Sequence, residues 1–386
     1  MKPFKITLGI DASRNKSGGA VNYLQGIFNN IDPIKYDFES VHLWSYQSLL
    51  NKLPDYPWLH KHTNKFLQKN IFWQLYWQFF LFKKESKSLG CDIILNTDAG
   101  TISGASPSVT MSRDMLSYEK GEIERYGLSF QSIRLLLLRF IQNHSLRNSE
   151  GVIFLTKYAS KVIQKSSGRI RNFTYIPHGI GKDFHKLKAN EVWPIEKDKI
   201  KIVYVSNTDL YKHQWNVVKA VSDLRGTDDF NYELHLIGGG SGLAQRKLMK
   251  CIDKYDSERK FTFLHPFLTK NEIIYWLKNS DLFVFASSCE NMPNTLLEGM
   301  SAGLPIACSY KGPMIEILKD GGIYFNPEEP YSIEFAISQL IKDEELRNRC
   351  KKRAKYISSY YSWDKCANNT LDFIKRTYLN LKTNES

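Results

Sequence analysis

The sequence predicts an α/β protein in which two successive halves each form a parallel β-sheet. Short apolar segments alternate with longer amphipathic segments along most of the chain, which is the pattern of parallel strands joined by crossover helices. Residues 173–199 interrupt this alternation with Gly, Pro and charged residues, and the pattern then begins again. Because 386 residues are too many for one ordinary core, we expect two domains. Ligands are then expected beyond the carboxyl ends of the strands.

The individual elements are bounded by Gly, Pro, Asn or Asp, which end regular structure. In the first half we expect strands at 4–11, 38–45, 91–97, 108–112 and 151–156, and helices near 19–30, 66–88, 131–147 and 157–167. In the second half we expect strands at 200–207, 232–240, 261–267, 281–287 and 304–309, and helices near 212–224, 242–255, 270–278 and 293–302. Residues 331–383 are expected to be mainly helical and either to cap the second domain or to cross back to the first.

The composition is that of an ordinary globular protein, with 42% hydrophobic and 24% charged residues. It excludes a disordered chain, a collagen and a coiled coil. The six cysteines form no CxxC pair and have no metal-ligand spacing to histidine, so they indicate reduced, buried thiols of a cytoplasmic protein. The N-terminus lacks a signal-peptide pattern, and no apolar run is long enough for a spanning helix.

The net charge of +13 arises from 53 Lys and Arg against 40 Asp and Glu. A basic surface suits nucleic acid, anionic lipid or phosphorylated substrates, but it is equally consistent with a merely solvated surface. Charge alone leaves these alternatives open.

The densest chemical signal is SSCENMPNTLLEGMSAGLPIACS at 287–309. A strand is expected to end at Ser287, and a loop then carries Glu290 before a helix that carries Glu298. A helix N-terminus presents unpaired amides and a partial positive charge, so this turn can hold a phosphate. Two carboxylates placed on the loop and on the helix can hold two ends of a polyhydroxylated ligand. The alternative is that these acidic residues only complement the helix dipole.

The Glu-x7-Glu spacing followed by GMSAGLP resembles the donor-site signature of glycosyltransferase family 4. Five further segments resemble other parts of that family in the right order, over nearly the whole chain: SGGAVNYLQGI (17–27), YIPHGIGKDF (175–184), VSNTDLYKHQWNVVKA (205–220), LHLIGGGSG (234–242) and YYSWDKCANNTL (360–371). MSRDMLSYEKGEIERYG (111–127) and GVIFLTKYAS (151–160) look like a subgroup that acts on bacterial surface polysaccharides, including O-antigen and capsule.

The resemblance implies the GT-B fold, in which two Rossmann-like domains with parallel sheets face a central cleft. It implies an acceptor-binding domain at 1–176, a donor-binding domain at 177–360, and a C-terminal helix at 361–386 that crosses back to the first domain. It also implies a retaining hexosyltransferase with no dedicated metal and no cofactor, whose donor is a UDP- or GDP-linked sugar. The implied acceptor is a glycan or a lipid-diphosphate-linked oligosaccharide at the inner face of the cytoplasmic membrane.

The same resemblance assigns roles to residues at matching positions. Lys212 would neutralise the donor diphosphate as the glycosidic bond breaks, Glu290 would hold sugar hydroxyls, and Glu298 would hold the ribose. Asp114 follows a first-domain strand and would bind a donor hydroxyl or orient the acceptor. The other expected donor contacts are Gly18, Gly19, His178, Asn207, Pro266, Phe267, Asn291, Pro293, Asn294 and Thr295.

Each of these assignments has a structural alternative. Lys212 can be a solvated lysine at a helix start, Gly18 and Gly19 can form a tight turn, and a lone His178 is more often structural. Many family members carry a second basic residue near 206–208, where this chain has Ser-Asn-Thr. The diphosphate would then depend on Lys212, on backbone amides and on polar side chains. With no carboxylate clearly placed as a nucleophile, front-side attack is favoured over double displacement.

KFLQKNIFWQLYWQFFLFKK at 65–84 is aromatic on more than one helical face and is flanked by lysines. This pattern suits a membrane interface, although we slightly favour a helix buried against the sheet. IRLLLLRF at 133–140 is ambiguous in the same way. Other function classes fit less well. A nucleic-acid-binding protein would carry a recognisable motif, a phosphorylase would need a pyridoxal-phosphate lysine, and an inactive relative would not need Lys212 and both glutamates.

Overall fold

The computed structural model describes residues 5–16, 18–187, 193, 199–227 and 230–385. The chain divides into two compact units, one formed by 1–179 together with 362–386 and the other by 180–361. We refer to them as unit 1 and unit 2. The domain boundaries expected from the sequence lie at 176/177 and 360/361.

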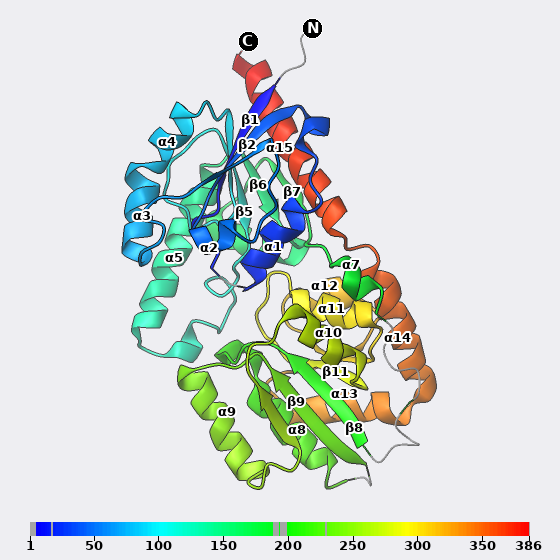
Figure 1. The fold of residues 1–386 in the computed structure, drawn as a ribbon. Coiled ribbons are helices and arrows are strands. Elements are labelled where there is room, and N and C mark those ends of the chain that lie inside the picture. The colour runs from blue at the N-terminus through cyan, green and yellow to red at the C-terminus, as the bar shows by residue number, and fades with distance from the viewer. Residues whose placement is uncertain (1–4, 17, 188–192, 194–198, 228–229, 386) are drawn as a thin grey trace. The chain divides into compact units, whose positions relative to one another are not determined.

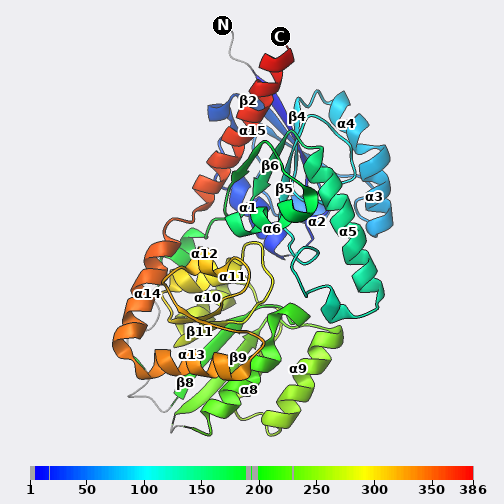
Figure 2. The same cartoon turned by 180° about the vertical axis from the view of Figure 1, so that it is seen from behind.

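Unit 1 is built on a seven-stranded parallel sheet with the order β3-β2-β1-β4-β5-β6-β7 (Figures 1 and 2). Its strands are β1 (Ile6–Asp11), β2 (Phe38–Trp44), β3 (Leu59–His62), β4 (Ile93–Asn96), β5 (Ser108–Ser112), β6 (Gly151–Phe154) and β7 (Phe173–Tyr175). Its helices are α1 (Gly18–Phe28), η1 (Pro33–Tyr36), α2 (Gln47–Leu50), α3 (Ile71–Phe80), α4 (Phe82–Ser88), η2 (Glu124–Tyr126), α5 (Phe130–Arg147), α6 (Lys157–Ser167) and α15 (Trp363–Glu385).

The helices of unit 1 cover both faces of its sheet. Right-handed crossovers place α3, α4, α5 and α6 on one face, because the connections β3-to-β4, β5-to-β6 and β6-to-β7 all run toward the same edge. On the other face α1 packs against α15, and Gly26 lies so close to the Trp363 ring that a Cβ at position 26 would overlap it. The last helix of the chain is therefore part of unit 1.

Unit 2 contains a six-stranded parallel sheet with the order β10-β9-β8-β11-β12-β13. Its strands are β8 (Lys199–Val205), β9 (Asn231–Ile237), β10 (Thr262–His265), β11 (Leu282–Phe285), β12 (Ile306–Ser309) and β13 (Ile323–Phe325). Its helices are α7 (Lys182–His185), η4 (Leu210–Lys212), α8 (Gln214–Leu224), α9 (Gly242–Tyr255), α10 (Lys270–Lys278), α11 (Asn294–Ala302), α12 (Met314–Leu318), α13 (Pro330–Lys342) and α14 (Glu344–Ser358). The predicted α/β class with two parallel sheets is confirmed.

Several predicted elements differ from the structure. The single helix expected at 66–88 is two helices, α3 and α4, which meet at Leu81. The short strands β3, β7 and β13 were not predicted, and all three are edge strands of three or four residues. An edge strand buries less apolar surface than a central one, so its sequence signal is weaker.

The preference for a buried aromatic helix is also wrong for one face of α3. Trp77 is fully buried, but Phe72 is 77% exposed and Phe79 is 59% exposed. Among the described residues, none of the helices has the length and apolar character needed to cross a membrane.

Candidate functional site

The sheet of unit 2 has its topological switch point between β8 and β11. The chain leaves β8 toward β9 and β10 on one side, and leaves β11 toward β12 and β13 on the other. The loops at the carboxyl ends of β8 and β11 therefore diverge and leave a crevice between them, which is where open α/β sheets bind ligands. The first loop carries Lys212 and the second carries Glu290.

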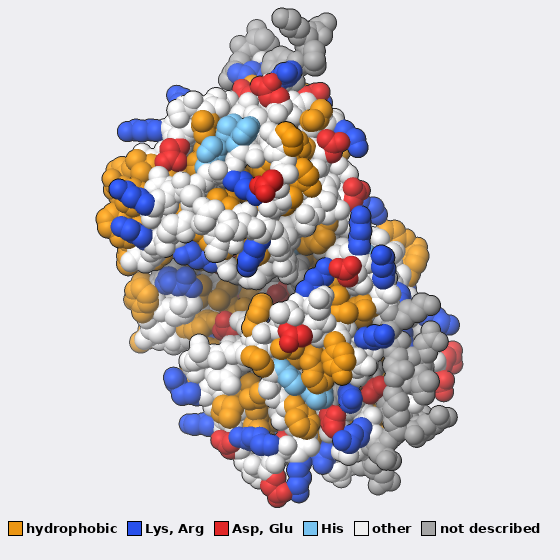
Figure 3. Space-filling view, viewed as in Figure 1, with side chains coloured by type: hydrophobic (Ala, Val, Ile, Leu, Met, Phe, Trp, Pro, Cys, Tyr) orange, Lys and Arg blue, Asp and Glu red, His pale blue; other side chains and the backbone are white. Residues whose placement is uncertain are grey.

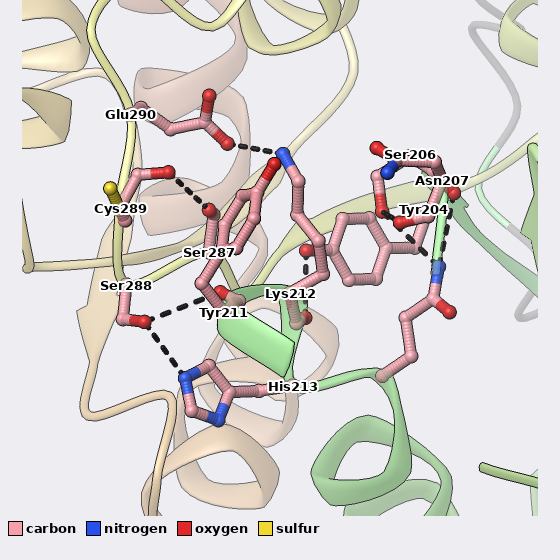
Figure 4. A network of polar contacts seen from close by, with 11 residues as sticks. Tyr204, Ser206, Asn207, Tyr211, Lys212, His213, Ser287, Ser288, Cys289 and Glu290 are labelled. Carbon is pink, nitrogen blue, oxygen red and sulfur yellow. Dashed lines mark hydrogen bonds and ion pairs between the residues drawn. The ribbon is translucent and has the colours of Figure 1, made fainter. Parts of the chain in front are cut away.

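Lys212 and Glu290 form an ion pair across this switch point (Figure 4). The Lys212 side chain is only 9% exposed and that of Glu290 only 14%. The Lys212 ammonium also lies 5.0 Å from the centre of the Tyr211 ring and 5.5 Å from that of Phe285. Burying two charges is unfavourable unless each offsets the other. Each side chain therefore depends on the other.

Hydrogen bonds between the two loops fix the backbone on either side of this pair. The Ser288 amide donates to the Tyr211 carbonyl at 2.8 Å, and the Ser288 hydroxyl lies 2.9 Å from Nε2 of His213. The buried Tyr204 hydroxyl donates to the Lys212 carbonyl at 2.9 Å. His213 has a left-handed backbone (φ 47°), which turns the chain sharply from η4 into α8. The loops thus hold Lys212 and Glu290 at fixed positions.

Helix α11 begins directly after the Glu290 loop, with Asn294 and Thr295 as its first residues. Pro293 occupies the N-cap position and has no side-chain oxygen with which to cap the first turn. Asn291 is buried in the preceding loop. This segment therefore has the features of an anion-binding turn at the switch point.

Glu298 lies on α11 and is partly buried. Burial raises the pKa of its carboxyl from 4.5 to about 8, and the nearby Lys270 ammonium acts in the opposite direction. The carboxyl is therefore mainly protonated at neutral pH. A protonated carboxyl can both donate and accept hydrogen bonds, which suits a pair of vicinal hydroxyls.

Two further loops at the same edge of the sheet close against each other. The Thr208 amide donates to the Gly239 carbonyl at 2.7 Å, and Gln214 donates to the Ser206 carbonyl at 3.1 Å. Gly238 has a φ of 133°, and a Cβ there would come within 2.6 Å of the Ser206 carbonyl oxygen. Glycine is therefore required where the turn after β9 meets the turn after β8.

The remaining residues expected in unit 2 lie around this edge. Asn207 is exposed between Ser206 and Thr208. Phe267 follows β10 and is 78% exposed. Pro266 lies next to the glycine turn, because a Cβ added at Gly239 would be 3.8 Å from Cα of Pro266. The expected residues of unit 2 thus follow the carboxyl ends of β10, β8 and β11.

Four expected residues belong to unit 1 instead. Gly18 and Gly19 are exposed at the start of α1, and Asp114 follows β5, where burial raises the pKa of its carboxyl. His178 is buried, with its ring 5.3 Å from that of Tyr23 and 5.5 Å from that of Trp363. These contacts place His178 in the packing of α1 against α15.

Unit 1 also has a polar cluster that the list of expected site residues lacks. The switch point of its sheet lies between β1 and β4, and Thr97, after β4, donates to Asn15, after β1, at 3.0 Å. Arg113 lies 3.4 Å from the same Asn15 oxygen. Its Nε and Nη1 atoms are buried and have no hydrogen-bond partner among the described residues. Asp11 is buried, and its pKa is raised by burial and lowered by hydrogen bonds from Ser13 and Gln78.

The sequence contained a signal for this cluster. Asp11, Thr97 and Arg113 each stand at the end of a predicted strand or directly beyond it, and parallel strands bring those ends to one edge. Arg113 lies in the quoted segment 111–127, but Asp11 and Thr97 lie in no quoted motif, so only the strand order brings the three together.

Comparison with known proteins identifies the second unit. Residues 186–356 match the model of the family described as glycosyl transferases group 1. This part of the chain is a glycosyltransferase group 1 domain. The ion pair, α11 and the glycine turn all lie within it. The match covers less than half of the chain, so it characterises this domain rather than the whole protein.

Curated relatives are similar to part of the chain. An uncharacterized glycosyltransferase of Methanocaldococcus jannaschii is 27% identical over 154 residues, which cover 39% of this chain and 40% of that protein. The O-antigen chain mannosyltransferase B of Escherichia coli is 22% identical over 173 residues, which cover 45% of each protein. The matched segments thus span under half the length of these relatives.

Solved structures resemble the chain over nearly its full length. A sucrose-phosphate synthase from Thermosynechococcus elongatus gives a TM-score of 0.75 at 13% identity, covering 98% of this chain and 100% of that one. HepE of Anabaena, in complex with UDP-glucose, gives 0.69 at 16% identity with the same coverage. These neighbours show that the chain has a GT-B-like fold with two parallel α/β sheets.

Proposed function

We propose that the chain is a retaining glycosyltransferase that moves a hexose-type sugar from a nucleotide-sugar donor to a glycan acceptor. The observation that carries the proposal is the buried Lys212–Glu290 pair at the switch point of a group 1 domain. In a pair of this kind, the lysine can bind a diphosphate and the glutamate can accept hydrogen bonds from sugar hydroxyls. The UDP and UDP-glucose complexes of HepE support a nucleotide-sugar as the donor.

We propose that donor binding exchanges the partners of this pair. The diphosphate would take Lys212, whose charge then stabilises the leaving group as the glycosidic bond breaks. Glu290 would be released from the ammonium and would accept hydrogen bonds from hydroxyls of the transferred sugar. The charge of the bound anion replaces that of Glu290, so Lys212 remains neutralised throughout.

The other contacts follow from the edge of the sheet. The first turn of α11, with Asn294, Thr295 and the preceding Asn291 and Pro293, would approach the phosphates. Glu298 would hold the ribose hydroxyls, and Asn207 would line the phosphate side. The base would lie against the backbone of Pro266 and Phe267. We propose no cofactor and no metal, with UDP or GDP as the leaving nucleotide.

For the acceptor side we propose residues of unit 1. Asp114 would bind a sugar hydroxyl or orient the acceptor. Gly18, Gly19 and His178 are proposed as further donor contacts. Front-side attack, in which the departing phosphate takes the acceptor proton, fits the absence of an expected carboxylate nucleophile in the sequence. A lipid-diphosphate-linked oligosaccharide of bacterial polysaccharide synthesis is the acceptor that we propose, met at the cytoplasmic face of the membrane.

Thermal unfolding with UDP, GDP, ADP, the matching monophosphates and the nucleotide-sugars tests this proposal. A ligand at about 100 times its dissociation constant stabilises the fold by about 2.7 kcal/mol. One base should stabilise the protein as the diphosphate more than as the monophosphate, and Lys212→Met should abolish that difference. Lys219→Met, which breaks the more exposed Lys219–Asp223 pair on α8, serves as the control.

The same assay separates the alternatives. Binding of a nucleotide-sugar without transfer to any acceptor would favour an inactive relative that serves as a binding partner. Stabilisation by nucleic acid, but by no nucleotide, would favour a basic nucleic-acid-binding protein. A trapped glycosyl-enzyme adduct would overturn front-side attack.

A further inference from the structure

Unit 1 contains a basic pocket that the proposed transfer reaction does not use. It has a volume of about 690 Å³ and is open to solvent, between α5, α6 and the segment that precedes α5. Four cationic residues line it, namely Lys120, Arg139, Lys161 and Lys165. Among the described residues, no carboxylate forms an ion pair with any of the four.

The acidic residue of the pocket is already engaged. Both carboxylate oxygens of Glu119 accept hydrogen bonds from the Tyr158 hydroxyl, at 2.7 and 2.9 Å. Four cations against one carboxylate leave a clear excess of positive charge at the pocket wall. Such a wall is complementary to a phosphate group, whose oxygens accept charge-assisted hydrogen bonds from Lys and Arg.

The side of α5 next to this pocket is apolar and exposed. Arg139 lines the pocket, while Leu136 and Phe140, one turn before it and directly after it on α5, are 46% and 73% exposed. Ile133 and Leu137 continue the same face toward the N-terminus of the helix and are 59% and 61% exposed. A ligand held in the pocket would therefore meet hydrocarbon on one side.

A second exposed apolar cluster lies on α3, which covers the same face of the sheet as α5 and the same flank of unit 1 (Figures 1 and 2). Its exposed members are Phe72, Trp73, Tyr76, Phe79 and Phe80. Lysines stand among them, as the space-filling view shows over α3 (Figure 3). The Lys69 ammonium lies 4.7 Å from the centre of the Trp73 ring, and Lys83 and Lys84 are exposed on α4.

These features together favour an interaction site over an ordinary solvated surface. Scattered exposed hydrophobic residues are normal, but aromatic and aliphatic side chains gathered on neighbouring helices mark an interaction site. Tyr, Trp and Lys around a hydrocarbon face are typical of the membrane–water interface. A groove for a soluble sugar phosphate would need the cations but not the two apolar helix faces.

We propose that this side of unit 1 docks on a bilayer of anionic phospholipid, with a lipid phosphate in the α5–α6 pocket. The exposed side chains of α3 and α5 enter the headgroup region, while Lys120, Arg139, Lys161 and Lys165 hold the phosphate. The inference rests on unit 1 alone and does not depend on the proposed transfer activity.

Co-sedimentation of the full chain with vesicles tests the docking. We expect binding to phosphatidylcholine vesicles that contain phosphatidylglycerol and weaker binding to phosphatidylcholine alone. Salt should weaken the binding that depends on phosphatidylglycerol. The double variant Lys161→Gln/Lys165→Gln should lower the partition onto phosphatidylglycerol vesicles by roughly 25-fold, at about fivefold per lysine. Because both lysines are exposed, the unfolding temperature should not change.

Matched controls separate this pocket from the overall charge. Lys250→Gln/Lys278→Gln removes the same charge from exposed positions of unit 2 and should leave the partition within about twofold. If both double variants lose binding equally, the net charge of +13 accounts for it and the pocket proposal fails. Phe72→Ser/Phe79→Ser should weaken binding to both vesicle types, whereas Tyr331→Ser/Phe335→Ser on α13 should not.

The last test measures binding of glycerol phosphate and of inorganic phosphate to the protein. If either binds the protein in a manner that depends on Lys161 and Lys165, while no vesicle sediments the protein, the pocket serves a soluble phosphate and the membrane proposal is wrong. Absence of binding to vesicles and to both phosphates would overturn the pocket and the docking surface together.

Discussion

The two parallel sheets of this protein place different chemistry at equivalent positions. At the switch point of unit 2, an ammonium and a carboxylate neutralise each other as Lys212 and Glu290. At the switch point of unit 1, Asn15 joins Thr97 and Arg113 through hydrogen bonds, and burial favours the neutral form of the neighbouring Asp11. One site is an ion pair, and the other is a hydrogen-bonded network around one guanidinium.

The difference indicates what each switch point can bind. An ion pair is exchangeable, because an incoming anion can replace the carboxylate without leaving the cation uncompensated. A buried network with two unpartnered guanidinium nitrogens among the described residues instead offers donors to a neutral or anionic oxygen. We therefore expect unit 2 to take the diphosphate and unit 1 to take hydroxyl-bearing ligands.

The largest effect is expected from breaking the ion pair on one side. Lys212→Met leaves Glu290 buried without its cation and should destabilise the fold by about 3–5 kcal/mol. Chemical denaturation of Lys212→Met, of Glu290→Gln and of the double variant Lys212→Met/Glu290→Gln measures these changes in unfolding free energy directly. The double variant should recover most of the lost stability. If its loss of unfolding free energy instead equals the sum of the losses in the two single variants, the two side chains are not coupled.

The next effect concerns the guanidinium of unit 1. Arg113→Met should lower transfer to the acceptor while leaving nucleotide-induced stabilisation unchanged, because Lys212 and Glu290 belong to the other unit. Transfer kinetics at saturating donor measure the effect on sugar transfer, and thermal shifts with nucleotide measure the effect on donor binding. Lysine keeps the positive charge but lacks the planar N–H donors of a guanidinium. Arg113→Lys should therefore retain only part of the transfer activity. Loss of nucleotide binding in Arg113→Met would break the division between the two switch points.

The sequence predicted the central elements of both sheets because their apolar segments are continuous and bounded by clear turn residues. It missed β3, β7 and β13, whose three or four residues lie at sheet edges. It also could not tell which faces of α3 are buried, since aromatic residues surround that helix and periodicity then carries no direction.

The site was predictable to a similar extent. Lys212 and Glu290 were named from motifs, but their contact requires β8 and β11 to be neighbours, and strand order is not written in any local pattern. The cluster of Asp11, Asn15 and Thr97 was missed for the same reason. Hydrogen bonds over long sequence separation, such as that between Thr97 and Asn15, become visible only in the fold.

Glu298 gives a pH-dependent effect in unit 2. Its pKa is raised in the folded state from 4.5 to about 8, so the folded protein binds more protons than the unfolded chain between these values. The contribution of this carboxyl to stability must then fall as the pH rises through this window. In Glu298→Gln the fall should be smaller, which unfolding temperatures measured from pH 5 to pH 8 can check. Identical profiles for the two proteins would mean that the carboxyl titrates normally.

The smallest effect is expected at the loop where a second basic residue is missing. Asn207 is exposed, so Asn207→Ala should change stability by no more than about 0.5 kcal/mol. Asn207→Arg adds a cation beside the site of Lys212, and we expect tighter diphosphate binding, with a gain of about 1 kcal/mol or less at an exposed position. Nucleotide titrations of wild type, Asn207→Ala and Asn207→Arg measure it. If Asn207→Arg binds no better while Lys212→Met binds far worse, the diphosphate is held by Lys212 and backbone amides alone. The Ser-Asn-Thr loop would then act by shape. Gln214 holds it by a hydrogen bond to the Ser206 carbonyl, and the Thr208 amide closes it against the glycine turn through the Gly239 carbonyl.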